Sequence, residues 1–63
     1  MDDIDIYRSA KLYIDQYGVH ASARAAMTAD AMLARGDLEG FNAWMRIGRA
    51  IEEMQSKEGG TTH

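Results

Sequence analysis

The sequence contains no proline, and two of its glycines, Gly18 and Gly36, divide it into three stretches of helix-forming residues. Alanine, methionine, leucine, glutamate and arginine are abundant in these stretches, and all five favour the α-helix. No stretch shows the alternation of apolar and polar residues that is typical of a half-buried strand. The sequence therefore predicts an all-α fold.

The first predicted helix covers about residues 3–17 and begins with acidic side chains. Such side chains suit a helix start, where they accept hydrogen bonds from free N–H groups and meet the positive end of the dipole. Apolar residues then recur at three- and four-residue spacing along one side: Ile6, Tyr7, Ala10, Tyr13, Ile14 and Tyr17. Leu12 lies off this stripe, and Gly18 can adopt the left-handed conformation that ends a helix.

The second predicted helix covers about residues 20–35 and is rich in alanine, whose small side chain lets another helix approach closely. It ends in the adhesion tripeptide Arg35-Gly36-Asp37. Each residue also has a structural role here: a cation in the last turn, a glycine that stops the helix, and an aspartate that caps the next one. We interpret the tripeptide as a turn between helices, because short motifs match by chance.

The third predicted helix covers about residues 38–56. Its apolar seam has the spacing 4, 3, 4, 3 and consists of Gly40, Trp44, Ile47, Ile51 and Met54. We expect Trp44 at the centre of the core, beside the alanines of the second helix. The three helices would form one domain over residues 1–58, followed by a flexible tail over 59–63. Alternatively, the first two helices are nearly continuous and the chain is a hairpin.

The arrangement of glycines, alanines and the tryptophan resembles a group of short helical proteobacterial proteins, a domain of unknown function. The residues that carry the resemblance are Tyr17-Gly18, Ala29-Asp30-Ala31-Met32-Leu33, Gly36-Asp37-Leu38-Glu39-Gly40, and Trp44 with Ile47, Ala50 and Ile51. The most specific elements are the Gly-Asp-x-x-Gly turn and the tryptophan four residues after Gly40. The resemblance covers about residues 6–54 and implies a fold but no reaction.

Composition and charge argue against several classes of function. The net charge is −3 and the seven lysines and arginines are scattered, whereas a nucleic-acid surface would cluster them. Without cysteine the chain has no disulfide and no thiolate metal site. No apolar run is long enough for a transmembrane helix, and the acidic start lacks the features of a secretion signal. We expect a cytoplasmic protein with no membrane contact.

Catalytic chemistry has only weak candidates in this sequence. His20, near Tyr17 and Ser22, could form an acid–base cluster, and Asp30 could be a buried carboxylate paired with an arginine. We interpret both as structural, because three short helices leave little room for a pocket and such pairs are more often structural than catalytic. The sequence therefore predicts no enzyme, no catalytic residue, no cofactor and no metal.

An interaction role is the first functional hypothesis. The apolar residues Leu38, Phe41 and Met45 lie to one side of the Trp44 seam, and Leu12 lies opposite the stripe of the first helix. We expect these four residues to contact a partner, either a second copy in a homodimer or a larger protein, because monomers usually avoid large exposed apolar patches. The alternative is a small nucleic-acid-associated regulator whose third helix reaches a phosphate backbone through Arg46 and Arg49.

Overall fold

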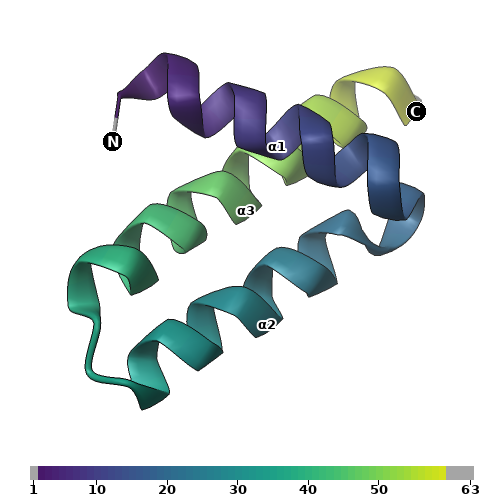
Figure 1. Cartoon of the computed structure of the whole chain (residues 1–63). Coiled ribbons are helices and arrows are strands. Elements are labelled where there is room, and N and C mark those ends of the chain that lie inside the picture. Colours follow the sequence, from purple (N-terminus) through teal and green to yellow (C-terminus); the bar gives the residue numbers. More distant parts are fainter. Residues whose placement is uncertain (1, 60–63) are drawn as a thin grey trace.

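The computed structural model describes residues 2–59, and these residues are almost entirely helical. They form α1 (Asp3–Tyr17), a short 3-10 helix η1 (Gly18–His20), α2 (Ala21–Ala34) and α3 (Leu38–Gly59). Figure 1 shows α2 and α3 running antiparallel, with α1 crossing near them. No residue of this described part lies in a strand, so the all-α expectation is confirmed.

The first predicted turn is itself helical, which departs from the expectation of three separate helices. Gly18–His20 joins α1 to α2 without an intervening loop, and Arg35–Asp37 is the single break in helix between residues 3 and 59. The chain still changes direction at Gly18, whose φ of 56° and ψ of −126° are rarely adopted by residues with a side chain. The alternative stated from the sequence, in which the first two helices are nearly continuous, describes this junction better than two separate helices do.

The turn between α2 and α3 follows from two adjacent residues. Gly36 has a φ of 78° and its N–H donates to the Leu33 carbonyl at 2.9 Å, while the Asp37 N–H donates to the Met32 carbonyl at 2.9 Å. This pair of bonds is the Schellman motif that closes many helices. The Asp37 Oδ1 atom then accepts a hydrogen bond from the Gly40 N–H at 2.8 Å. The interpretation of Gly36 as a helix stop and Asp37 as a cap is confirmed, whereas Arg35 is the C-cap of α2 and does not lie in its last turn as expected.

The end of α3 also departs from the expected bounds. The helix continues to Gly59, whereas the sequence predicted an end near Ser56 and a tail that begins at Gly59. The rest of the predicted tail, residues 60–63, lies outside the described residues.

The core is built mainly from small side chains. Five of the eight buried apolar residues are alanines, and α2 contributes three of them, Ala21, Ala25 and Ala29. The largest fully buried side chains are Ile47 and Ile51 of α3. Trp44 is only partly buried at the edge of this core, so its expected position at the centre is wrong. The physical reason is that close approach of α2 through alanine leaves too little space for an indole ring inside.

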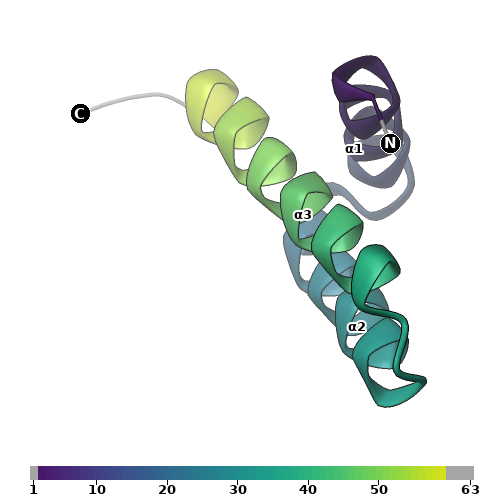
Figure 2. The same ribbon diagram turned by 90° about the vertical axis from the view of Figure 1, so that its left-hand side faces the viewer.

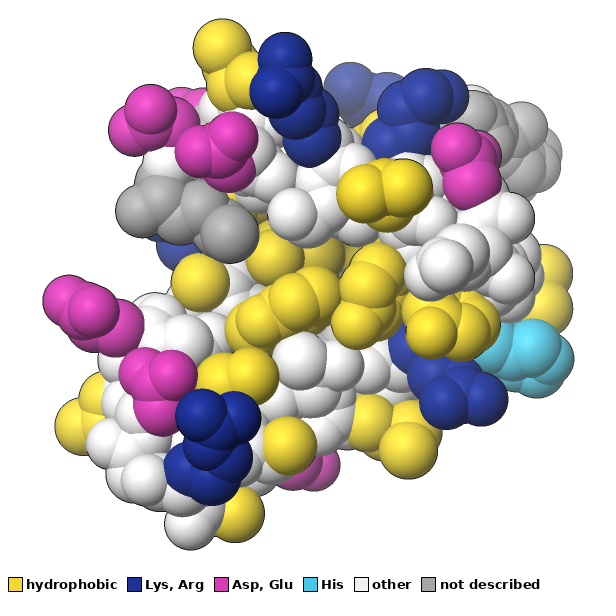
Figure 3. All heavy atoms as spheres, viewed as in Figure 1, with side chains coloured by type: hydrophobic (Ala, Val, Ile, Leu, Met, Phe, Trp, Pro, Cys, Tyr) yellow, Lys and Arg dark blue, Asp and Glu magenta, His cyan; other side chains and the backbone are white. Residues whose placement is uncertain are grey.

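Helix α1 contacts both other helices from one side, as the end-on view in Figure 2 shows. It buries Ile6 and Ala10 against the core. Near its end, the Tyr13 ring lies 5.0 Å from the Trp44 ring and 5.1 Å from the Tyr17 ring, measured between centroids. Apolar side chains gather in a band between α1 and α2 in Figure 3. The described chain is elongated, with extents of 39 × 21 × 20 Å.

Candidate functional site

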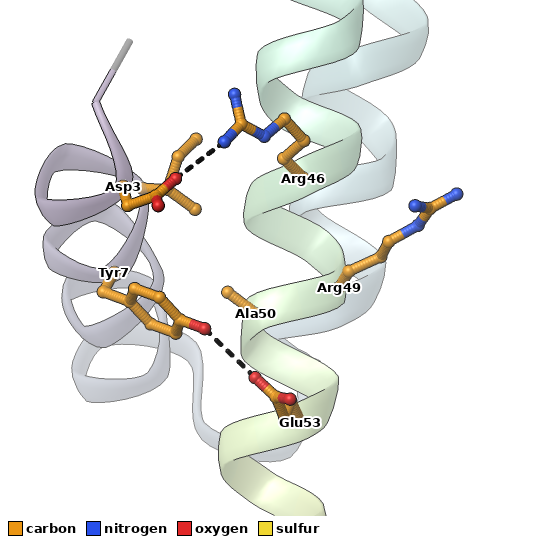
Figure 4. A pocket seen from close by; sticks show the side chains of 7 residues that line it. Asp3, Tyr7, Arg46, Arg49, Ala50 and Glu53 are labelled. Carbon is orange, nitrogen blue, oxygen red and sulfur yellow. Dashed lines mark hydrogen bonds and ion pairs between the residues drawn. The ribbon is translucent and has the colours of Figure 1, made fainter.

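A polar depression of about 340 Å³ lies between α1 and α3. Figure 4 shows its walls, which consist of Asp3, Ile6, Tyr7, Arg46, Arg49, Ala50 and Glu53. The two helices bring these residues together although they are separated by some forty positions in the sequence. The depression is open to solvent, and four of its polar side chains pair across it: Arg46 with Asp3, and Tyr7 with Glu53.

Two contacts cross the depression. Arg46 Nη2 lies 2.9 Å from Asp3 Oδ1, and the Tyr7 hydroxyl donates to Glu53 Oε1 at 3.2 Å. The hydrogen bond to Glu53, followed by the negative charge of that carboxylate, raises the pKa of Tyr7 above its ordinary value. Both pairs are exposed, and such pairs contribute little stability. They orient α1 on α3 and do not form a reactive centre.

The depression does not present the two predicted arginines as a joint cationic patch. Figure 4 shows the Arg46 guanidinium directed at Asp3, while the Arg49 side chain points away from α1. The carboxylates of Asp3 and Glu53 lie at the same depression and oppose the approach of a phosphate. This arrangement gives no support to the nucleic-acid alternative.

The candidate catalytic residues are not assembled into a site. His20 is exposed in η1, whereas Tyr17 lies under the Arg24 guanidinium at 4.9 Å and the Ser22 hydroxyl donates to Glu52 Oε2 at 3.1 Å. Asp30 is exposed on α2, so it is not the buried carboxylate that the sequence allowed. Within residues 2–59, no group of three His, Cys, Asp or Glu side chains could hold a metal ion.

An apolar surface, here called the outer face, spans α2 and α3. A groove of about 200 Å³ lies between the two helices, lined by Ser22 and Ala26 of α2 and by Trp44, Met45, Gly48, Arg49 and Glu52 of α3. Residues three, four or seven positions away lie on the same side of a helix, so the surface extends from this groove along both helices. The outer face comprises Ala26, Leu33, Leu38, Phe41, Met45 and Gly48. No residue of α1 lines its groove.

Met45 lines the groove, and helical spacing puts Leu38 and Phe41, two further residues of the predicted interface, on the same side of α3. Leu38 is 61% exposed, Met45 is 41% exposed and Phe41 is partly buried. Leu12 is 61% exposed but belongs to α1, which docks through Ile6 and Ala10. Because successive helical residues are about 100° apart, Leu12 points roughly away from Ala10 and from α3. The structure does not bring Leu12 to the outer face.

Sequence reasoning overlooked Gly48, which lies in the groove of the outer face. A signal for it was present, because an isolated glycine inside a helical pattern is unfavourable and asks for a packing or functional reason. Ala26, one of the alanines of the second predicted helix, is exposed and lines the same groove. Neither assignment could be made before the relative placement of α2 and α3 was known.

A second apolar surface, the band between α1 and α2, is occupied by contacts within the chain. The Tyr13 hydroxyl is 3.2 Å from Thr28 Oγ1, and Arg24 covers the Tyr17 ring. The first contact gives the Tyr13 hydroxyl a hydrogen-bond partner, and the second covers the face of the Tyr17 ring. By contrast, the residues that define the outer face are all apolar or glycine. A hydrogen bond from Ser22 to Glu52 lies at one end of its groove.

Comparison of the chain with models of protein families, with curated proteins and with solved structures finds no match in any of the three. None of the described helices combines the length and the apolar character that crossing a membrane requires.

Proposed function

We propose that the chain is a non-catalytic helical protein-interaction module that associates with itself through the outer face. The observation that carries the proposal is the uncovered apolar surface of α2 and α3, where Leu33, Leu38 and Met45 are each more than 40% exposed. Large side chains are exposed here while the core consists mostly of alanines. Burial of this face by a partner would supply the apolar contact that the core lacks.

The size of the chain supports a second copy as the partner. A chain of about 60 residues buries only about 60% of the surface of its unfolded state, so its stability is marginal. Disulfides are excluded by the absence of cysteine, and oligomerisation is one of the remaining ways to stabilise so small a domain.

The resemblance to short proteobacterial helical proteins stays a prediction, and it implies no reaction that would compete with this proposal. The nucleic-acid alternative has less support, because Asp3 occupies Arg46 and the overall charge is −3.

Sedimentation equilibrium at micromolar concentration tests the proposal. The wild-type protein should sediment at twice the chain mass of 7.0 kDa. Phe41→Asp should return it to the mass of one chain with its helix content retained, because a charge would then lie in the apolar contact. Leu12→Asp is the matched control, since it adds the same charge on α1 and should leave the dimer intact. A wild-type protein that sediments as a single chain would refute self-association.

A further inference from the structure

The two junctions between helices differ in the signals that end one helix and start the next. The α2–α3 turn has a stop glycine, Gly36, followed by the cap residue Asp37. At the α1–α2 junction, the last turn of α1 contains no basic residue and the first turn of α2 contains no acidic residue. His20, at the N-cap of α2, makes no side-chain cap hydrogen bond. Apart from Gly18, residues 3–34 therefore carry the signals of one helix, with acidic residues at its start and a stop glycine after its end.

Gly18 is the residue that bends this part of the chain. Its N–H still donates to the Ile14 carbonyl, as in a continuing α-helix, but its φ of 56° and ψ of −126° are not helical. Tyr17 before it and Ala21 after the 3-10 turn have right-handed helical angles. The Gly18 carbonyl accepts a hydrogen bond from the Gln55 side-chain amide at 2.8 Å, which holds the bend on α3. Rotation of the Gly18 backbone to helical angles would join α1 and α2 into one helix about 48 Å long.

The surface that α1 covers is complementary to α1, whichever chain supplies that helix. Ile6 of α1 is buried in the core. Arg46 Nη2 of α3 lies 2.9 Å from Asp3 Oδ1, and the Tyr7 hydroxyl donates to Glu53 Oε1 at 3.2 Å (Figure 4). A straightened α1 would leave this surface uncovered, and α1 of a second copy matches it side chain for side chain. Exchange of an identical element between chains is a low-cost route to a dimer.

We propose that α1 is an exchangeable element and that Gly18 is its hinge. In the bent form, α1 lies on α3 of its own chain. When Gly18 adopts helical angles, α1 docks on α3 of a second copy, which returns its own α1 in the same way. Every contact of α1 with α3 is regained between the chains, so the conformation of one residue decides where α1 docks. The exchange does not involve the outer face and does not rest on the proposed function.

The two enantiomers of alanine at position 18 test the hinge. A Cβ atom built on Gly18 meets no atom within 4 Å, so Gly18→Ala acts through the backbone alone. L-alanine disfavours a φ of 56° and favours the right-handed helix. D-alanine has the mirror-image preferences, so it favours the bend and opposes the straight helix. Chemical synthesis of the 63-residue chain can place D-alanine at this position, which gives a control of identical composition.

Sedimentation at equal micromolar concentration compares the two proteins. Gly18→Ala should sediment at no less than twice the mass of the D-alanine protein. Its association should be at least about tenfold tighter, because exchange relieves the backbone strain of both chains. The comparison holds whether or not the outer face associates, since both proteins share that face. Equal masses, or a loss of helix content in Gly18→Ala measured by circular dichroism, would overturn the hinge.

Isotope-filtered NMR identifies the contact between the chains. In a mixture of labelled and unlabelled Gly18→Ala chains, nuclear Overhauser effects should connect Tyr7 of one chain with Glu53 of the other. In the wild type, with Gly18 bent, the same pair should be connected within one chain. Association of Gly18→Ala without this contact between chains would overturn the exchange of α1. A wild-type protein that sediments as a single chain refutes association through the outer face and leaves the hinge standing.

Discussion

The α2–α3 hairpin and helix α1 are held in place by different kinds of contact. The hairpin is closed by backbone geometry at Gly36 and by the Asp37 cap, and its helices approach closely through alanine. Helix α1 joins α2 directly through η1 and is oriented on α3 by Ile6, Ala10 and two exposed polar contacts.

This difference separates local from tertiary causes of structure. A stop glycine beside a cap aspartate specifies a turn whatever lies elsewhere in the chain. The position of α1 depends on the fit of a few side chains to a surface that exists only after α2 and α3 have packed. We therefore expect α1 to open more readily than the hairpin, and four predictions test this difference.

Ile51→Ala should have the largest effect, because Ile51 is fully buried in the core that both regions share. Truncation of such a side chain costs about 2–5 kcal/mol of unfolding free energy. Chemical denaturation followed by circular dichroism measures the loss. Ile4→Ala is the matched control, because Ile4 is 67% exposed and its truncation should have little effect. Equal losses for the two variants would contradict the assignment of the core.

Ala10→Leu should detach α1 and spare the hairpin. Ala10 of α1 is completely buried against the core. Larger side chains at such a site lower the free energy of unfolding by about 1–3 kcal/mol. Hydrogen exchange should therefore accelerate at the amides of α1 more than at those of α2 and α3. Lys11→Leu, at the exposed neighbouring position, should leave exchange unchanged. Uniform acceleration in all three helices would show that α1 and the hairpin open as one unit.

Asp37→Ala should weaken the hairpin turn and leave the docking of α1 unchanged. The substitution removes the carboxylate that accepts the Gly40 N–H, and the loss of such a cap costs about 1 kcal/mol. Thermal unfolding measures the loss. Asp37→Asn, which can still accept this bond, should retain most of the stability. If the asparagine variant is as unstable as the alanine variant, the cap hydrogen bond is not the cause.

The contact between Tyr7 and Glu53 should have the smallest effect, and that effect should depend on pH. Glu53 raises the folded-state pKa of Tyr7 above the unfolded value, so the contact stabilises the fold below about pH 10. This stabilisation is lost as the pH rises through the folded-state pKa, because the tyrosine can then no longer donate its proton. The stability difference between wild type and Tyr7→Phe should shrink over that range.

Phenolate absorbance gives a second measure of the same contact. Glu53→Gln removes the negative charge and should lower the pKa of Tyr7 toward its ordinary value. Glu52→Gln is the matched control, because Glu52 bonds to Ser22 on another side of α3. An unchanged tyrosine titration in Glu53→Gln would show that the contact does not persist in solution.

The fold class and the second turn could be predicted from the sequence because both follow from local chemistry. Helix-forming residues without proline predict helices, and Gly36 followed by Asp37 predicts a stop and a start. The side of α3 that carries Leu38, Phe41 and Met45 was likewise visible from spacing alone. The sequence did not show which other helix packs against each side of a given helix.

Only the tertiary structure decided three other features: the helical junction at Gly18, the separation of Leu12 from the outer face, and the presence of Ile47 and Ile51 at the core centre, where Trp44 was expected. Periodicity assigns an apolar side to each helix separately. It does not say how closely two helices approach or at which angle a third one crosses them. Here the alanines of α2 let α3 approach so closely that isoleucines fill the interior, and the indole ring of Trp44 remains at its edge beside Tyr13.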